Sequence, residues 1–101
     1  MKLTSSDVNA SRRVSLGDDI VVQLPERPTT GYRWRPQLDA AAFAVVGDTY
    51  EGPEEPRGAA GLRTFVVRAL RAGPAVLRLT KVRPWESTPV EEYQVNLDVR
   101  G

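Results

Sequence analysis

The stretch of sequence that decides the fold is Tyr93-Gln94-Val95-Asn96-Leu97-Asp98-Val99-Arg100, in which every odd position is apolar and every even position is polar. Successive side chains of a β-strand point to opposite faces of a sheet. Strict alternation is therefore typical of a strand that buries one face and exposes the other. We expect residues 93–100 to pack one face of such a strand on a hydrophobic core.

Several segments upstream share this strand character. Residues 64–69 and 77–80 alternate on either side of the turn signal Gly73-Pro74, so we expect them to form a hairpin. The segment Leu38-Asp39-Ala40-Ala41-Ala42 has a helix-forming composition but is long enough for only about one turn. The complete set of expected strands is residues 8–14, 20–24, 32–35, 43–50, 64–69, 77–80 and 93–100.

Seven short strands in 101 residues predict an all-β fold, an immunoglobulin-like β-sandwich of about seven antiparallel strands. Trp34 on the third strand suits the core tryptophan of that architecture. A chain of this length forms one hydrophobic core without help from metals or disulfides, so we expect residues 1–101 to be a single domain.

Strand direction predicts where the connections lie. Successive strands of such a sandwich run in opposite directions, so alternate connections emerge at the same end of the molecule. One end should therefore collect residues 25–31, 51–61 and 83–90. These connections hold the most unusual sequences of the chain, which points to this end as the functional one.

The composition excludes several classes of partner. Fourteen Lys and Arg against thirteen Asp and Glu leave a net charge of +1, so we expect neither nucleic acid nor a membrane as a partner. We also expect a monomer. The absence of cysteine leaves the redox compartment open. No stretch has the apolar length of a signal peptide or a membrane span. We expect a cytoplasmic protein, or a periplasmic or secreted one if a leader was removed.

The side chains available for catalysis are few. Histidine and cysteine are both absent, which removes the commonest general base, the soft metal ligands and any Ser-His or Cys-His nucleophile. A Ser-Lys pair would have to use Lys2 or Lys81, and the sequence places neither beside a serine. The acidic residues 51–55 lack the spacing of a calcium loop. We therefore expect no enzymatic activity, no catalytic residue, no cofactor and no metal.

Recognition motifs fill the three connections instead. Arg27-Pro28-Thr29-Thr30-Gly31-Tyr32 resembles the Asn-Pro-Thr-Thr-Gly-Tyr/Phe loop of the chagasin family of cysteine-protease inhibitors. Gly58-Ala59-Ala60-Gly61 is similar to that family's Gly-x-Gly-Gly loop, and Arg83-Pro84-Trp85 is similar to its Arg-Pro-Trp loop. The order and separations also match, and the resemblance extends over essentially the whole chain.

This resemblance implies a reversible, tight-binding inhibitor of papain-like cysteine proteases. The loop Thr29-Thr30-Gly31 would enter the protease cleft beside the catalytic cysteine, and the other two loops would grip the cleft walls, with Trp85 as a large rigid anchor. The implied protease-binding residues are Pro28, Thr29, Thr30, Gly31, Tyr32, Gly58, Ala59, Ala60, Gly61, Arg83, Pro84 and Trp85. Strand alternation assigns Tyr32 and Trp34 mainly to the inward face.

Two positions depart from the family pattern. Arg27 replaces the asparagine before the proline, so another group must stabilise that turn. Ala60 replaces the second glycine, and alanine would be strained there if φ is positive. An alternative interpretation is a generic immunoglobulin-like binding or adhesion module without inhibitory activity.

Overall fold

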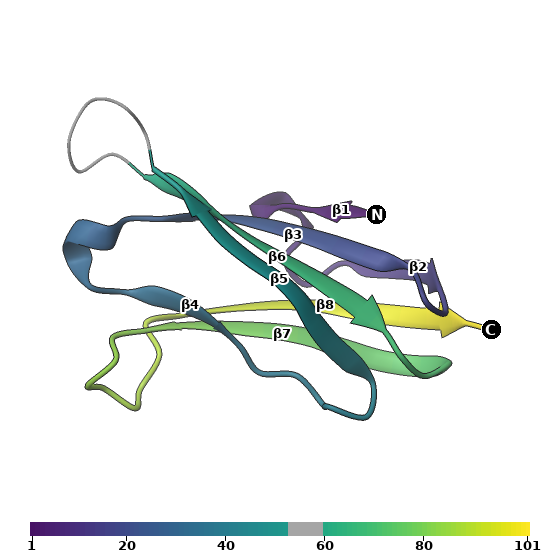
Figure 1. Ribbon diagram of the computed structural model, residues 1–101. Helices are drawn as coiled ribbons and strands as arrows, with labels where there is room; N and C mark the ends of the chain where they lie inside the picture. Colours follow the sequence, from purple (N-terminus) through teal and green to yellow (C-terminus); the bar gives the residue numbers. More distant parts are fainter. Residues whose placement is uncertain (53–59) are drawn as a thin grey trace.

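The computed structural model describes residues 1–52 and 60–101, which form two four-stranded sheets packed face to face (Figure 1). Gly58 and Ala59 of the predicted second loop lie outside the described residues. In chain order the elements are β1 (Lys2–Leu3), the 3-10 turn η1 (Ser5–Asp7), β2 (Ser11–Ser15), β3 (Asp19–Glu26), the 3-10 turn η2 (Pro28–Thr30), β4 (Arg33–Pro36), β5 (Phe43–Glu51), β6 (Gly61–Ala69), β7 (Gly73–Val82) and β8 (Glu91–Arg100).

The predicted immunoglobulin-like all-β sandwich is confirmed, with one change to the strand pairing. One sheet has the order β1-β3-β6-β5 and the other β2-β8-β7-β4. Two pairs, β1 with β3 and β2 with β8, are parallel rather than antiparallel. Both pairs join strands an even number of strands apart in the chain, which run in the same direction because successive strands reverse. After β2 the chain changes sheet, since the Leu16 N–H bonds to Arg100 of one sheet and the Gly17 N–H to Ala69 of the other.

The expected hairpin of residues 64–69 and 77–80 is wrong. The strands that contain them, β6 and β7, belong to different sheets. Residues 70–72 carry the chain from one sheet to the other, so the two apolar faces meet through the core instead of lying side by side. Residues 38–42 form no helix, because the Asp39 side chain accepts the Ala41 N–H at 2.9 Å and holds a turn.

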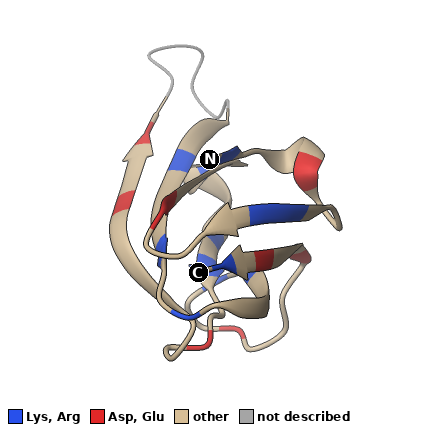
Figure 2. Ribbon diagram, turned by 90° about the vertical axis from the view of Figure 1, so that its right-hand side faces the viewer, with Lys and Arg blue, Asp and Glu red and all other residues tan. Residues whose placement is uncertain are grey.

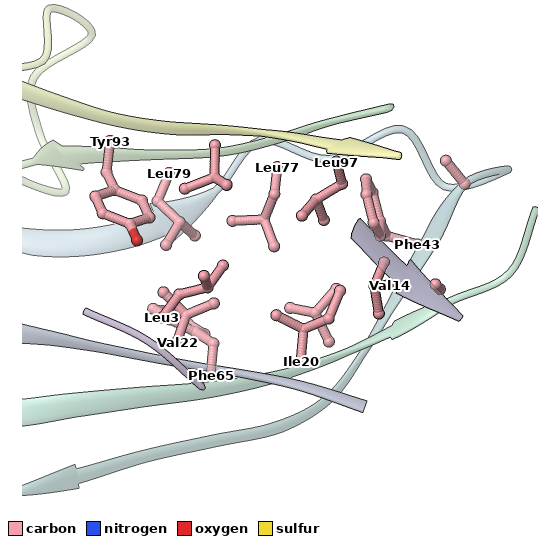
Figure 3. Packing of buried hydrophobic residues seen from close by; sticks show 14 of the residues in the cluster. Leu3, Val14, Ile20, Val22, Phe43, Phe65, Leu77, Leu79, Tyr93 and Leu97 are labelled. Atoms are coloured by element: carbon pink, nitrogen blue, oxygen red, sulfur yellow. The ribbon is translucent and has the colours of Figure 1, made fainter. Parts of the chain in front are cut away.

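Apolar side chains from both sheets fill the space between them (Figure 3). Leu3, Val22 and Phe65 face Leu77 and Leu79 across the core. All four odd positions of the stretch 93–99 are buried, as the alternation predicted. No helix in the part of the chain that the structure describes is long and apolar enough to cross a membrane.

Two aromatic side chains, Trp34 and Tyr93, pack together toward one end of the core. Trp34 is 4% exposed and meets Tyr93 edge to face, with 6.5 Å between the ring centroids. The Tyr93 hydroxyl donates a hydrogen bond to the Thr4 carbonyl at 2.8 Å, which ties the N-terminal segment to β8. Burial, followed by the nearby charge of Asp7, raises the pKa of Tyr93 to about 12.

The strand register brings the three connections to one end. Glu26, the last residue of β3, pairs with Gly61, the first residue of β6. In the other sheet Arg33 of β4 pairs with Val82, the last residue of β7. The turn η2 and the β7–β8 connection lie together at the left of Figure 1, and the C-terminus lies at the opposite end. We call the left-hand end the loop pole.

Residues of both charges occupy neighbouring strands of the sandwich (Figure 2). Several of them pair across strands, as Asp19 does with Arg68 and Glu92 with Arg78. Exposed pairs of this kind contribute little to stability, typically below about 1 kcal/mol each. The strands therefore depend mainly on the core, and the surface carries mixed charge.

Candidate functional site

The first loop, residues 27–32, is closed by its own hydrogen bonds. Pro28 opens the turn η2, and Gly31 ends it in the left-handed conformation with φ of 79°. The Gly31 N–H donates to the Pro28 carbonyl at 3.0 Å. The Thr30 hydroxyl donates to the Arg27 carbonyl at 2.8 Å and accepts the Tyr32 N–H at 3.3 Å. The family has an asparagine at position 27 that we would expect to stabilise this turn. Here Thr30 stabilises it instead.

Arg83 joins the third loop, residues 83–90, to the first. Its Nε donates to the Thr30 carbonyl at 3.0 Å, and its guanidinium lies 4.3 Å from the centroid of the Tyr32 ring. Glu86 holds the same guanidinium from the other side, at 3.4 Å. The two loops are therefore fixed relative to each other. Tyr32 lies before β4 and is half-buried under Arg83, which corrects the expectation that it points into the core with Trp34.

Trp85 is the most exposed large apolar side chain among the described residues, with 72% of its surface accessible. Its ring lies against Gly31, where an added Cβ would come within 3.2 Å of the Trp85 Cη2 atom. The positive φ favours glycine at position 31, and a side chain there would also push against the Trp85 ring. The tips of the first and third loops are exposed at Pro28, Thr29, Thr30, Pro84 and Trp85, and the contacts of Arg83 and Trp85 with the first loop place the two tips side by side.

The second loop is described only at its two ends, Gly52 and Ala60. Ala60 is exposed, whereas Gly61 is buried at the start of β6. A Cβ at Gly61 would come within 2.5 Å of the Glu51 carbonyl oxygen and still closer to the Tyr50 hydroxyl. Close packing of β6 on β5 therefore accounts for this glycine.

A buried ion pair lies under the loops, between Glu26 and Arg63. Glu26 is 1% exposed; its Oε1 accepts the Trp34 N–H at 2.7 Å, and its Oε2 accepts Arg63 Nη2 at 2.6 Å and Nε at 3.0 Å. Arg63 Nη1 also donates to Asp48 at 3.1 Å. Burial opposes the charge on Arg63, but the hydrogen bonds and charges of Glu26 and Asp48 outweigh it and raise the pKa of Arg63.

The loop motifs do not predict this pair, although the strand pattern contains a signal for it. Glu26 continues the inward register of Ile20, Val22 and Leu24, and Arg63 stands two positions before the inward Phe65. A charged side chain at an inward position needs a partner of opposite charge, because an unpaired buried charge is costly. The antiparallel register of β3 and β6 supplies that partner.

In residues 1–52 and 60–101 no group of three or more His, Cys, Asp or Glu side chains is placed to hold a metal ion. What the loop pole exposes is the aromatic ring of Trp85 and the polar groups of the first loop.

The order of the three loop motifs and the sandwich beneath them can be compared with known families. The model of the chagasin family of peptidase inhibitors, I42, matches residues 13–99. The chain belongs to the chagasin family. Membership makes it a peptidase inhibitor and not an enzyme, and it confirms the family that the loop motifs predicted.

Known members of the chagasin family resemble the chain over most of its length. Amoebiasin-2 from Entamoeba histolytica is 31% identical over 87 residues, which cover 83% of this chain and 71% of the relative. Chagasin from Trypanosoma cruzi is 30% identical over 90 residues, covering 83% and 82%. The crystal structure of the cysteine protease inhibitor EhICP2 from Entamoeba histolytica has a TM-score of 0.88 at 27% identity, covering 98% of this chain and 94% of that one.

Proposed function

We propose that this chain is a reversible, tight-binding inhibitor of papain-like cysteine proteases, and that residues 1–101 act as one inhibitory domain. The observation that carries the proposal is the pairing of the first and third loops, in which Arg83 holds the Thr30 carbonyl while Trp85 stays exposed beside Gly31. A preformed projection of this kind binds a cleft with little further ordering. The match to a family of peptidase inhibitors and the similarity to EhICP2, a cysteine protease inhibitor, support the same activity.

The mechanism is occlusion of the cleft. The first loop enters beside the catalytic cysteine, and its backbone is a closed 3-10 turn with internal hydrogen bonds. An extended peptide could enter the same cleft as a substrate, but this turn would have to break its hydrogen bonds to Arg27 and Pro28 before it became extended. The loop thus fills the site without presenting a readily cleaved bond.

The predicted contact residues fall into two roles in this proposal. Pro28, Thr29, Pro84 and Trp85 are exposed and would touch the protease directly. Thr30, Gly31, Tyr32 and Arg83 would mainly hold those tips in place, because their side chains or backbone contact one another. In the second loop, Gly58, Ala59 and Ala60 would contact the cleft wall, and Gly61 would serve packing.

Titration of papain with the purified chain tests the proposal. We expect a stoichiometric loss of activity, recovery of activity on dilution, and an intact inhibitor on a denaturing gel. A generic adhesion module would leave papain and related proteases fully active at micromolar concentration. Cleavage of the chain during the titration would identify it as a substrate and would contradict the occlusion mechanism.

A further inference from the structure

We propose that the ion pair between the buried Glu26 and the partly buried Arg63 is a positioning device that sets the base of the first loop against strands β5 and β6. This inference rests on the proposed protease inhibition and names two residues outside the three loop motifs that control it. The pair contains the one buried charged side chain in the core among the described residues, and it lies directly under the loop pole.

The first half of the device closes the base of the first loop. Glu26 immediately precedes this loop in β3, and Trp34 follows it in β4. These strands belong to different sheets, so no backbone ladder links them. The Glu26 carboxylate makes the link instead, by accepting the Trp34 N–H at 2.7 Å. The Trp34 indole N–H adds a second link to the Pro25 carbonyl at 2.9 Å.

The second half links Glu26 to β5 and β6, the strands on either side of the second loop. Arg63 follows that loop in β6, whereas Asp48 and Tyr50 precede it in β5. The Arg63 guanidinium bonds to Glu26 through two nitrogens and to Asp48 through the third. Its plane also lies 5.2 Å from the centroid of the Tyr50 ring, and the Tyr50 hydroxyl donates to the Glu26 carbonyl at 3.3 Å.

Stability alone does not account for an ion pair at this place. Replacing a buried pair by uncharged side chains of similar volume is often neutral for stability, because desolvation offsets the attraction of the charges. A guanidinium and a carboxylate do, however, bond in a restricted planar geometry. A first loop whose base is held in one arrangement on β5 and β6 loses less conformational entropy on binding, which favours slow dissociation of the complex.

The double variant Glu26→Gln/Arg63→Met tests this role. It removes both charges, keeps similar volumes and leaves an oxygen to accept the Trp34 N–H. We expect a melting temperature close to that of the wild type and a Kd for papain that rises by roughly tenfold, mainly through faster dissociation. The matched control is Asp19→Asn/Arg68→Met, which removes an ion pair between the same two strands at the far end and should leave both rate constants unchanged.

Three results would overturn the inference: a folded double variant with the wild-type Kd and dissociation rate, weaker binding that appears only together with a lowered melting temperature, or an equal effect of the control. If the double variant does not fold, Arg63→Lys decides by the same criteria, since lysine keeps the charge but cannot bond to Glu26 and Asp48 as a fork. A wild-type chain that leaves papain active would instead refute the proposed function itself, so the two failures are distinguishable.

Discussion

Trp85 projects a large aromatic ring into solvent and rests it on the first loop. The core lies elsewhere and loses nothing when this ring is removed. We expect Trp85→Ala to raise the inhibition constant for papain by at least about 30-fold, which corresponds to roughly 2 kcal/mol for a binding hot spot. The melting temperature should stay near the wild-type value. Val76→Ala, an exposed apolar truncation near the other end of β7, is the matched control. A main effect on melting temperature would assign Trp85 a structural role.

The Thr30 hydroxyl makes two bonds inside the first loop, to Arg27 and to Tyr32. Thr30→Ala removes both, which should weaken inhibition by about 1–2 kcal/mol because the turn must be ordered on binding. Global stability should change little, since the loop is exposed. Thr30→Ser keeps the hydroxyl and should restore most of the affinity in the same papain titration. Equal losses for alanine and serine would show that the methyl group, and not the hydroxyl, matters.

The pKa of Tyr93, raised from 10.0 to about 12, gives the fold a dependence on alkaline pH. The folded state keeps the neutral phenol, whereas the unfolded chain ionises it at lower pH. This contribution to stability is therefore complete below pH 10 and is lost as pH rises toward about 12. Urea unfolding across that range should show a steeper loss for the wild type than for Tyr93→Phe. Parallel curves for the two proteins would contradict the assignment.

At the scale of the strands, alternation identifies which face of each element is buried but not which strand lies beside it. Residues 93–100 and 20–24 lie inside β8 and β3 as predicted. The error over residues 64–69 and 77–80 has this origin, because two apolar faces that oppose each other across a core alternate in the same way as two neighbours in one sheet. Likewise, a proline and a glycine around Thr29-Thr30 predict a turn, but the contact of Arg83 with the Thr30 carbonyl comes from strand register.

In the ion pair beneath the loops, we expect one substitution alone to lower the free energy of unfolding more than both substitutions together. Arg63→Met alone leaves the Glu26 carboxylate buried without its partner. We expect the free energy of unfolding to fall by about 3 kcal/mol, and addition of Glu26→Gln to recover most of that loss. Chemical denaturation of the two variants and the wild type measures this coupling. A loss that the second substitution does not reduce would show that Arg63 stabilises β6 independently of Glu26.

At the scale of the whole molecule, the fold and the loop pole could both be predicted because direction reverses at each strand. That rule needs only the number and order of the strands, so it placed residues 25–31 and 83–90 together despite the wrong hairpin. The supporting residues could not be predicted in the same way. Glu26, Arg63 and Arg83 act through partners 37 and 53 residues distant in the chain, and such contacts depend on the packing of two sheets.

The sandwich is elongated, with principal dimensions of 44 × 28 × 22 Å. Gly101 follows β8 at the end opposite the loop pole, where Val99 pairs with Gly73 at the start of β7. A dye, a solid support or a fused carrier protein attached at Gly101 would therefore stand clear of Trp85 and the first loop. Because the loops lie at one end, the other end is free for attachment. A chain immobilised through Gly101 could serve as an affinity reagent for capturing active proteases.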